Sequence, residues 1–155
     1  MRNHLTVYEG AWRKLTILLG YQGASAGGLM GVEYLSVHST SNAADVLRVV
    51  GEARQMQPEA LVVAYSHDEN QRLVGAVSLV ALLQSDPYAT MQVLADSEPV
   101  HGHPDADLTE ITLAVAGYHL LVLPVLDRDD KLIAVLTIDD IRAAAISPEQ
   151  RRMRE

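Results

Sequence analysis

The feature that most constrains the fold of this chain is an internal repeat of strand-like and helix-like segments. The apolar run 73–78 follows another apolar run across a polar turn, and the apolar run 132–137 does the same later in the chain. When Ser78 is set against Thr137, the two strand–turn–strand segments align without a gap. A sequence that repeats itself in this way predicts two similar structural units.

Each unit is expected to have the order β-α-β-β-α. The first is predicted to hold strand 33–37, helix 43–53, strands 61–65 and 73–78, and helix 79–84. The second is predicted to hold an extended segment 99–102, helix 108–116, strands 120–126 and 132–137, and helix 139–145. The strands are too apolar to have one face in water, so the two units must bury them against each other. We expect an α+β fold of two mixed three-stranded sheets in a pseudo-twofold sandwich, with Pro124 at an edge or a bulge.

The chain is expected to divide into four parts. Trp12, Leu15 and Leu18 have helical spacing, and glycines follow them, so residues 1–31 are predicted to form an N-terminal helix and a Gly-rich connector. The first repeat is placed at 32–86, the second at 87–146, and a basic tail at 147–155.

Composition excludes several classes of function. The formal net charge of −8 repels phosphate backbones, so we expect no nucleic-acid partner. The chain contains no cysteine, which excludes disulfides, thiolate metal sites and a cysteine nucleophile. No apolar run approaches the ~20 residues that cross a membrane, so we expect no membrane insertion and a cytoplasmic location. No nucleophile elbow, His-Glu-x-x-His or P-loop occurs, so we do not expect an enzyme.

Two segments carry a motif. Leu-Pro-Val-Leu-Asp127 is followed, after an acidic turn, by Leu-Ile-Ala-Val-Leu-Thr-Ile-Asp-Asp-Ile141, and this pair of runs resembles the CBS (cystathionine-β-synthase) domain. Thr137 and Asp140 match the Thr and Asp of the family pattern, whereas the first unit has Gly75 and Ser78 but Ala81 in place of the Asp. The resemblance implies a tandem CBS pair, or Bateman module, with one good nucleotide half-site for ATP or AMP.

The resemblance also implies which residues bind the nucleotide. They are Thr137, Asp140, His103, Pro104, Val125 and, in the first unit, Ser78. From the residues alone, a second interpretation of Thr137 and Asp140 stays open, since a hydroxyl and a carboxylate at this spacing also cap a helix without any ligand. Asp107 and Glu110 have the spacing of a capping box as well.

A narrower resemblance covers about three quarters of the chain. Ser-Ala-Gly-Gly-Leu-Met30, Glu-Tyr-Leu-Ser-Val37, Ser85-Asp-Pro-Tyr88 and Tyr-His-Leu-Leu-Val-Leu-Pro-Val125 are similar to the cytosolic part of MgtE-type magnesium transporters. In that family Mg²⁺ at acidic interfaces closes the gate and ATP tunes the response. The candidate Mg²⁺ ligands are Glu33, Asp86, Asp96 and Asp140, with plain surface charge as the alternative.

Together these patterns predict a non-catalytic regulatory module that forms a homodimer, binds an adenine nucleotide, Mg²⁺ or both, and changes its dimer packing. A membrane transporter is an expected partner. The alternative is a degenerate CBS pair that binds no ligand and serves as a dimerisation or interaction module.

Overall fold

The computed structural model describes residues 33–95 and 99–145. The first unit contains β1 (Leu35–His38), α3 (Ala43–Glu52), a 3₁₀ helix (Pro58–Leu61), β2 (Val63–His67), β3 (Leu73–Ser78), α4 (Leu79–Gln84) and α5 (Met91–Leu94). The second contains α6 (Leu108–Gly117), β4 (Val122–Leu126), β5 (Leu132–Thr137) and α7 (Ile138–Ala145). The predicted N-terminal helix, the predicted basic tail and Asp96 lie outside the described residues.

The two sheets differ in size. In the first unit β1 pairs in parallel with β2, which pairs antiparallel with β3, so this sheet has the expected three strands. In the second unit β4 and β5 form a two-stranded antiparallel sheet, and only Gly102 bridges to Val125 where a third strand was expected. The expectation of a third strand there was wrong: Pro104, two residues after the bridge, has no N–H with which to extend a ladder.

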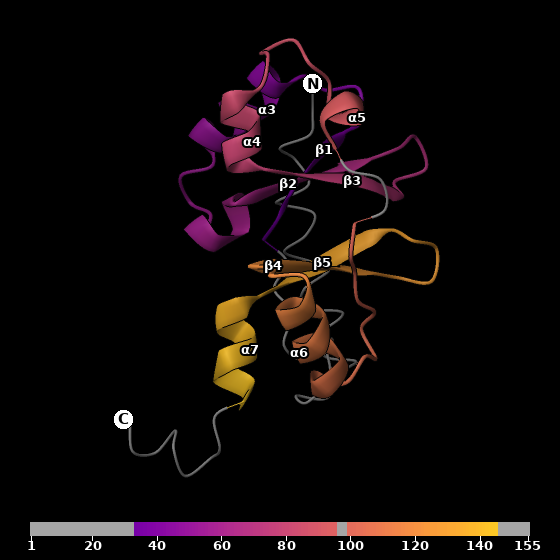
Figure 1. Ribbon diagram of the computed structural model, residues 1–155. Coiled ribbons are helices and arrows are strands. Elements are labelled where there is room, and N and C mark those ends of the chain that lie inside the picture. Colours follow the sequence, from indigo (N-terminus) through magenta and orange to yellow (C-terminus); the bar gives the residue numbers. More distant parts are fainter. Residues whose placement is uncertain (1–32, 96–98, 146–155) are drawn as a thin grey trace.

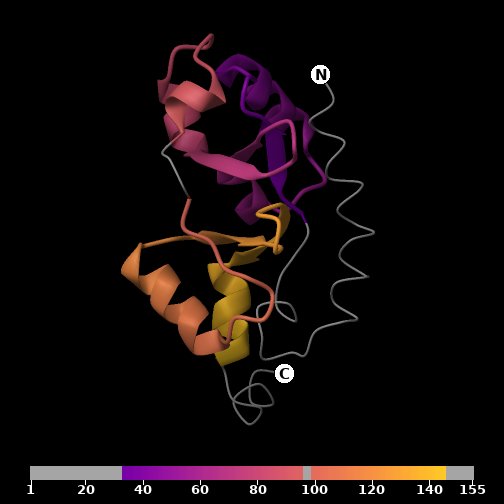
Figure 2. The ribbon, with the colours of Figure 1, turned by 90° about the vertical axis from the view of Figure 1, so that its right-hand side faces the viewer.

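The sheets pack face to face and the helices cover their outer sides. Figure 1 shows the two sheets stacked at the centre, with α3, α4 and α5 beyond the first and α6 and α7 beyond the second. The view turned by 90° shows the same layers (Figure 2). This α+β arrangement confirms the predicted class.

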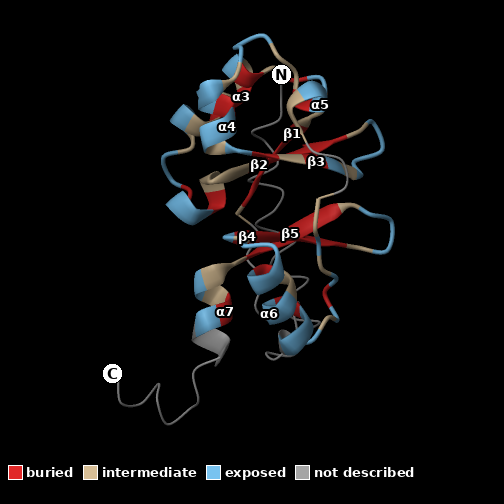
Figure 3. Cartoon of the chain, in the orientation of Figure 1, coloured by how far each residue is buried: buried red, intermediate tan, exposed pale blue. Residues whose placement is uncertain are grey.

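Three apolar cores account for the buried strands in Figure 3. One core lies between β1–β3 and the helices of the first unit, and another lies between β4–β5 and the helices of the second. The third joins the two sheets, and its buried members are Tyr34, Tyr65, Val122, Leu126, Leu132 and Val135. The inference that the strands are buried on both faces is therefore correct for β2, β4 and β5, whereas Val74 of β3 is 40% exposed.

Two local differences from the sequence expectation have simple causes. The strand predicted at 61–65 begins at Val63, because Pro58 starts a 3₁₀ turn that continues through Leu61. Helix α5 was not predicted, and its Met91 is fully buried in the core of the first unit. Met91 therefore packs with the first unit, and the boundary at 86/87 stays a prediction. Within the described part of the chain, no helix is long and apolar enough to cross a membrane.

Candidate functional site

The site is organised around the junction of β5 and α7. Thr137 ends β5, and Asp140 lies in the first turn of α7. The backbone N–H of Asp140 donates to Thr137 Oγ1 at 3.2 Å, and the backbone N–H of Thr137 donates to Asp140 Oδ2, also at 3.2 Å. This reciprocal pair is a capping box, so the helix cap weighed from the sequence is present. The two bonds hold both half-buried side chains in fixed positions.

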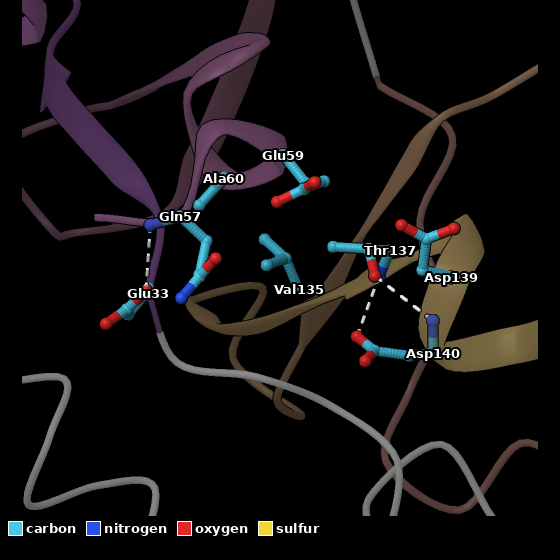
Figure 4. A pocket seen from close by; sticks show the side chains of 8 residues that line it. All are labelled: Glu33, Gln57, Glu59, Ala60, Val135, Thr137, Asp139 and Asp140. Carbon is cyan, nitrogen blue, oxygen red and sulfur yellow. Dashed lines mark hydrogen bonds between the residues drawn. The ribbon is translucent and has the colours of Figure 1, made fainter. Parts of the chain in front are cut away.

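These two side chains open onto a cavity of about 370 Å³ between the two units. The second unit contributes Val135, Thr137, Asp139 and Asp140, and the first contributes Glu33, Gln57, Glu59 and Ala60. Figure 4 shows the two sets facing each other across the cavity. Its volume lies within the roughly 300–1,000 Å³ of small-molecule sites. Because both units form the walls, a ligand here would contact both.

The cavity is acidic. Four of its lining residues carry carboxylates, namely Glu33, Glu59, Asp139 and Asp140, and no lysine or arginine among the described residues lines it. Glu33 also has a structural contact, since its Oε2 accepts a hydrogen bond from the backbone N–H of Gln57 at 3.2 Å. This hydrogen bond connects the segment before β1 to the loop that carries Glu59. The arrangement favours cations and neutral hydroxyl-bearing groups over a bare phosphate chain.

The corresponding junction of the first unit is simpler. Ser78 Oγ accepts a hydrogen bond from the backbone N–H of Ala81 at 3.1 Å and so caps α4. Ala81 has no carboxylate to return the bond, and Ser78 does not line the cavity. The two repeats therefore differ in structure as they do in sequence: the second has a reciprocal capping box on the cavity wall, and the first has a single cap away from it.

Three other predicted nucleotide ligands lie away from this cavity. His103 Nδ1 is 3.2 Å from the carbonyl oxygen of Leu126, and the neighbouring Pro104 is buried. Val125 is fully buried in the core between the second sheet and its helices. None of the three lines the cavity, so their assignment to the adenine face stays a prediction.

The structure brings together two of the four predicted metal ligands. Glu33 and Asp140 line the same cavity, whereas Asp86 lies in the exposed turn after α4, where its Oδ1 accepts a hydrogen bond from the backbone N–H of Tyr88 at 2.8 Å. Across residues 33–95 and 99–145, no three His, Asp or Glu side chains are grouped so that they could hold a metal ion. Any Mg²⁺ here would therefore keep most of its water ligands.

Sequence reasoning missed part of the cavity wall. Gln57, Glu59 and Ala60 come from the 3₁₀ helix and the residue before it, in a loop without any motif. One signal was available: the first unit has extra residues around Pro58 compared with the second. An insertion in one copy of a repeat often marks a functional loop.

The chain is similar to known proteins in sequence and in structure. The CBS domain family model matches residues 92–147. The magnesium transporter MgtE of Thermus thermophilus is 33% identical over 126 residues, which is 80% of this chain and 27% of that protein. MgtE of Enterococcus faecalis is 27% identical over 124 residues, with the same two shares. The chain thus spans about a quarter of the length of these relatives.

A solved structure is similar over most of the chain. The cytosolic domain of the Mg²⁺ channel MgtE, crystallised in complex with ATP, superposes with a TM-score of 0.79 at 31% identity. The match covers 84% of this chain and 52% of that domain.

Proposed function

Because this chain carries a CBS pair similar to the cytosolic CBS region of MgtE-type magnesium transporters, we propose that it is a non-catalytic regulatory module. It binds an adenine nucleotide, Mg²⁺ or both in the cavity between its two units, and binding changes the packing of a homodimer. It acts in the cytoplasm, with a membrane transporter as its partner.

The observation that carries the proposal is the position of Thr137 and Asp140 on the wall of an inter-unit cavity. The capping box uses one oxygen of the Asp140 carboxylate, and an ionised carboxylate has further lone pairs with which to accept bonds from ribose hydroxyls. The similar MgtE cytosolic domain was solved with ATP, which supports an adenine nucleotide as the ligand.

The carboxylates of the cavity argue for a joint role of Mg²⁺. Glu33, Glu59 and Asp139 line the same cavity as Thr137 and Asp140, and like charges at short range repel. A hydrated Mg²⁺ held by one or two of these carboxylates neutralises the repulsion and ligates the phosphates. We therefore expect adenosine to bind without Mg²⁺, and AMP and ATP to bind more tightly with it.

A ligand in this cavity can transmit a signal because it contacts both units. It shifts the relative placement of the units only to the extent that it binds one arrangement better than another. Glu33 and Asp140 lie on opposite sides of the cavity, so their mutual repulsion favours an open arrangement and a bound cation favours a closed one.

A ligand-free assembly module is the second candidate. The capping box at Thr137 is complete without a ligand, and large apolar side chains are exposed on the helices, for example Val80, Leu83 and Leu113. An exposed apolar surface of this kind favours assembly with another chain.

Calorimetric titration separates the two candidates. The full chain is titrated with Mg²⁺ alone and with adenosine, AMP and ATP, each with and without millimolar Mg²⁺, and compared with Asp140→Asn and with the exposed control Asp86→Asn. Loss of a charged hydrogen-bond acceptor is worth about 1.5–3 kcal/mol, so Asp140→Asn should weaken binding roughly tenfold to a hundredfold. Asp86→Asn should not. If neither an adenine compound nor Mg²⁺ alone binds, the module is the ligand-free one.

A further inference from the structure

A second cavity lies entirely within the first unit and shares no lining residue with the first cavity. Its volume is about 420 Å³, and it lies beside the β2–β3 hairpin and α5. Its walls include the Ser39 and Thr40 hydroxyls after β1, the Asp68 and Glu69 carboxylates of the hairpin turn, and Ser66 of β2. Nothing in the proposed nucleotide function uses this place.

Ser66 is the residue that marks the cavity as a binding site. It is 1% exposed, and its Oγ has no hydrogen-bond partner among the described residues. Gly75, opposite it on β3, provides the space for this hydroxyl, since a Cβ built on Gly75 would lie 2.7 Å from Ser66 Oγ. A buried hydroxyl without a partner is unfavourable, and an alanine in its place would pack without that cost. A ligand in the cavity would supply the missing partner.

The charges of the cavity select a cation. Asp68 Oδ1 accepts hydrogen bonds from the backbone N–H groups of Asn70 at 2.8 Å and Arg72 at 3.0 Å. These bonds lower the pKa of Asp68, so its carboxylate stays ionised at neutral pH. Glu69 Oε1 lies 3.6 Å from His38 Nε2. Among the described residues, no lysine or arginine lines the cavity, so an anionic ligand would meet two carboxylates there.

The remaining walls distinguish an organic cation from a metal ion. Val74 and Ala95 offer apolar surface, which an alkyl chain can cover and a hydrated metal ion cannot use. Across the described residues, no three His, Asp or Glu side chains are grouped so that they could hold a metal ion directly, and a hydrated Mg²⁺ would leave the apolar surface uncovered.

We propose that this cavity binds a small alkylammonium ion of the aliphatic diamine class. The ammonium N–H groups donate to the carboxylates of Asp68 and Glu69 and to hydroxyl oxygens, including Ser66 Oγ, and the methylene chain packs on Val74 and Ala95. An ammonium group has only donors to offer, and this wall supplies mainly acceptors.

The test is an NMR titration of the isotopically labelled full chain with 1,4-diaminobutane at constant ionic strength. The matched control ligand is 1,4-butanediol, which has the same length and no charge. Shifts of amide resonances are expected to be concentrated at residues 39–40, 66–69 and 92–95. Ser66→Ala and Glu69→Gln should each weaken binding at least fivefold. Glu52→Gln, the same change at an exposed position that lines neither cavity, should leave binding unchanged.

Ser66→Ala also separates binding from folding. Because the hydroxyl lacks a partner in the free protein, its removal should leave the melting temperature unchanged or raise it, while affinity falls. The proposal is overturned if the diamine shifts no resonance, if the diol binds equally well, or if Ser66→Ala keeps full affinity. It is also overturned if Mg²⁺ produces the same shifts at equal concentration, because the site would then be a general cation site.

Discussion

At the scale of single residues, His67 is a titratable group whose pKa the fold shifts. It ends β2, its ring packs edge-on against His38 with centroids 5.8 Å apart, and its Nδ1 lies 2.8 Å from Ser36 Oγ. Burial lowers the pKa of His67 below its usual 6.5, the nearby His38 lowers it further, and Asp68 opposes the shift. The fold therefore favours the neutral imidazole.

This shift predicts a specific dependence of stability on pH. With the folded-state pKa below the unfolded value, the unfolded chain binds more protons once the pH falls below about 6.5. The free energy of unfolding should therefore decrease from pH 7 toward pH 5 and be insensitive to His67 above pH 7. Urea unfolding at several pH values should show a shallower slope for His67→Gln than for the parent. The exposed control His101→Gln should keep the parent slope. If His101→Gln has the shallower slope and His67→Gln keeps the parent slope, His67 is not the titrating group.

Also at this scale, the sequence identified part of the candidate site and not the rest. Thr137 and Asp140 were found because they lie three residues apart at a strand–helix junction, where both a cap and a ligand contact are local events. Glu59 and Gln57 could not be found in this way, because they reach the cavity through the packing of one unit against the other. Spacing along the chain carries no information about that packing.

At the scale of elements, the turns of the β2–β3 and β4–β5 hairpins have the same hydrogen bonds and backbone conformation. Asp127 Oδ1 accepts hydrogen bonds from the backbone N–H groups of Asp129 and Lys131 at 2.8 and 3.0 Å, as Asp68 does in the first unit. Gln71 and Asp130 have positive φ values of 66° and 62° at matching places. The sequence predicted both turns from their polar residues. It did not predict the register shifts before His67 and Leu126, which depend on the paired strand.

A pair of glycine substitutions tests how tightly β3 packs on the segment after α5. A Cβ on Gly75 would lie 2.5 Å from Ala95 Cβ, so Gly75→Ala should cost about 1–3 kcal/mol of unfolding free energy. Gly51 in α3 has nothing within 4 Å of its added Cβ, so Gly51→Ala should stabilise the chain by up to about 1 kcal/mol. Thermal unfolding of both variants measures the difference. Equal effects of the two would show that Ala95 does not pack on β3.

At the scale of the whole molecule, the two units are joined through their sheets. The Tyr34 hydroxyl donates to the carbonyl oxygen of Leu132 at 3.3 Å, and the backbone N–H of Leu73 donates to the carbonyl oxygen of Asp130 at 2.9 Å. The apolar runs predicted that the sheets must cover each other, because neither could leave such strands in water. They could not predict which residues would meet, since that is decided by shape at the interface.

This shared core predicts that the units unfold together. Leu126 is 3% exposed in the core between the sheets, so Leu126→Ala should cost about 2–5 kcal/mol. In this variant, backbone NMR signals from α3 and from α6 should then disappear at the same urea concentration, and that concentration should be lower than in the parent chain. Leu113→Ala, at a position 69% exposed on α6, should change stability by less than about 0.5 kcal/mol. If Leu126→Ala lowers the midpoint of α6 alone, the first unit stays folded without the second, and the two units do not unfold together.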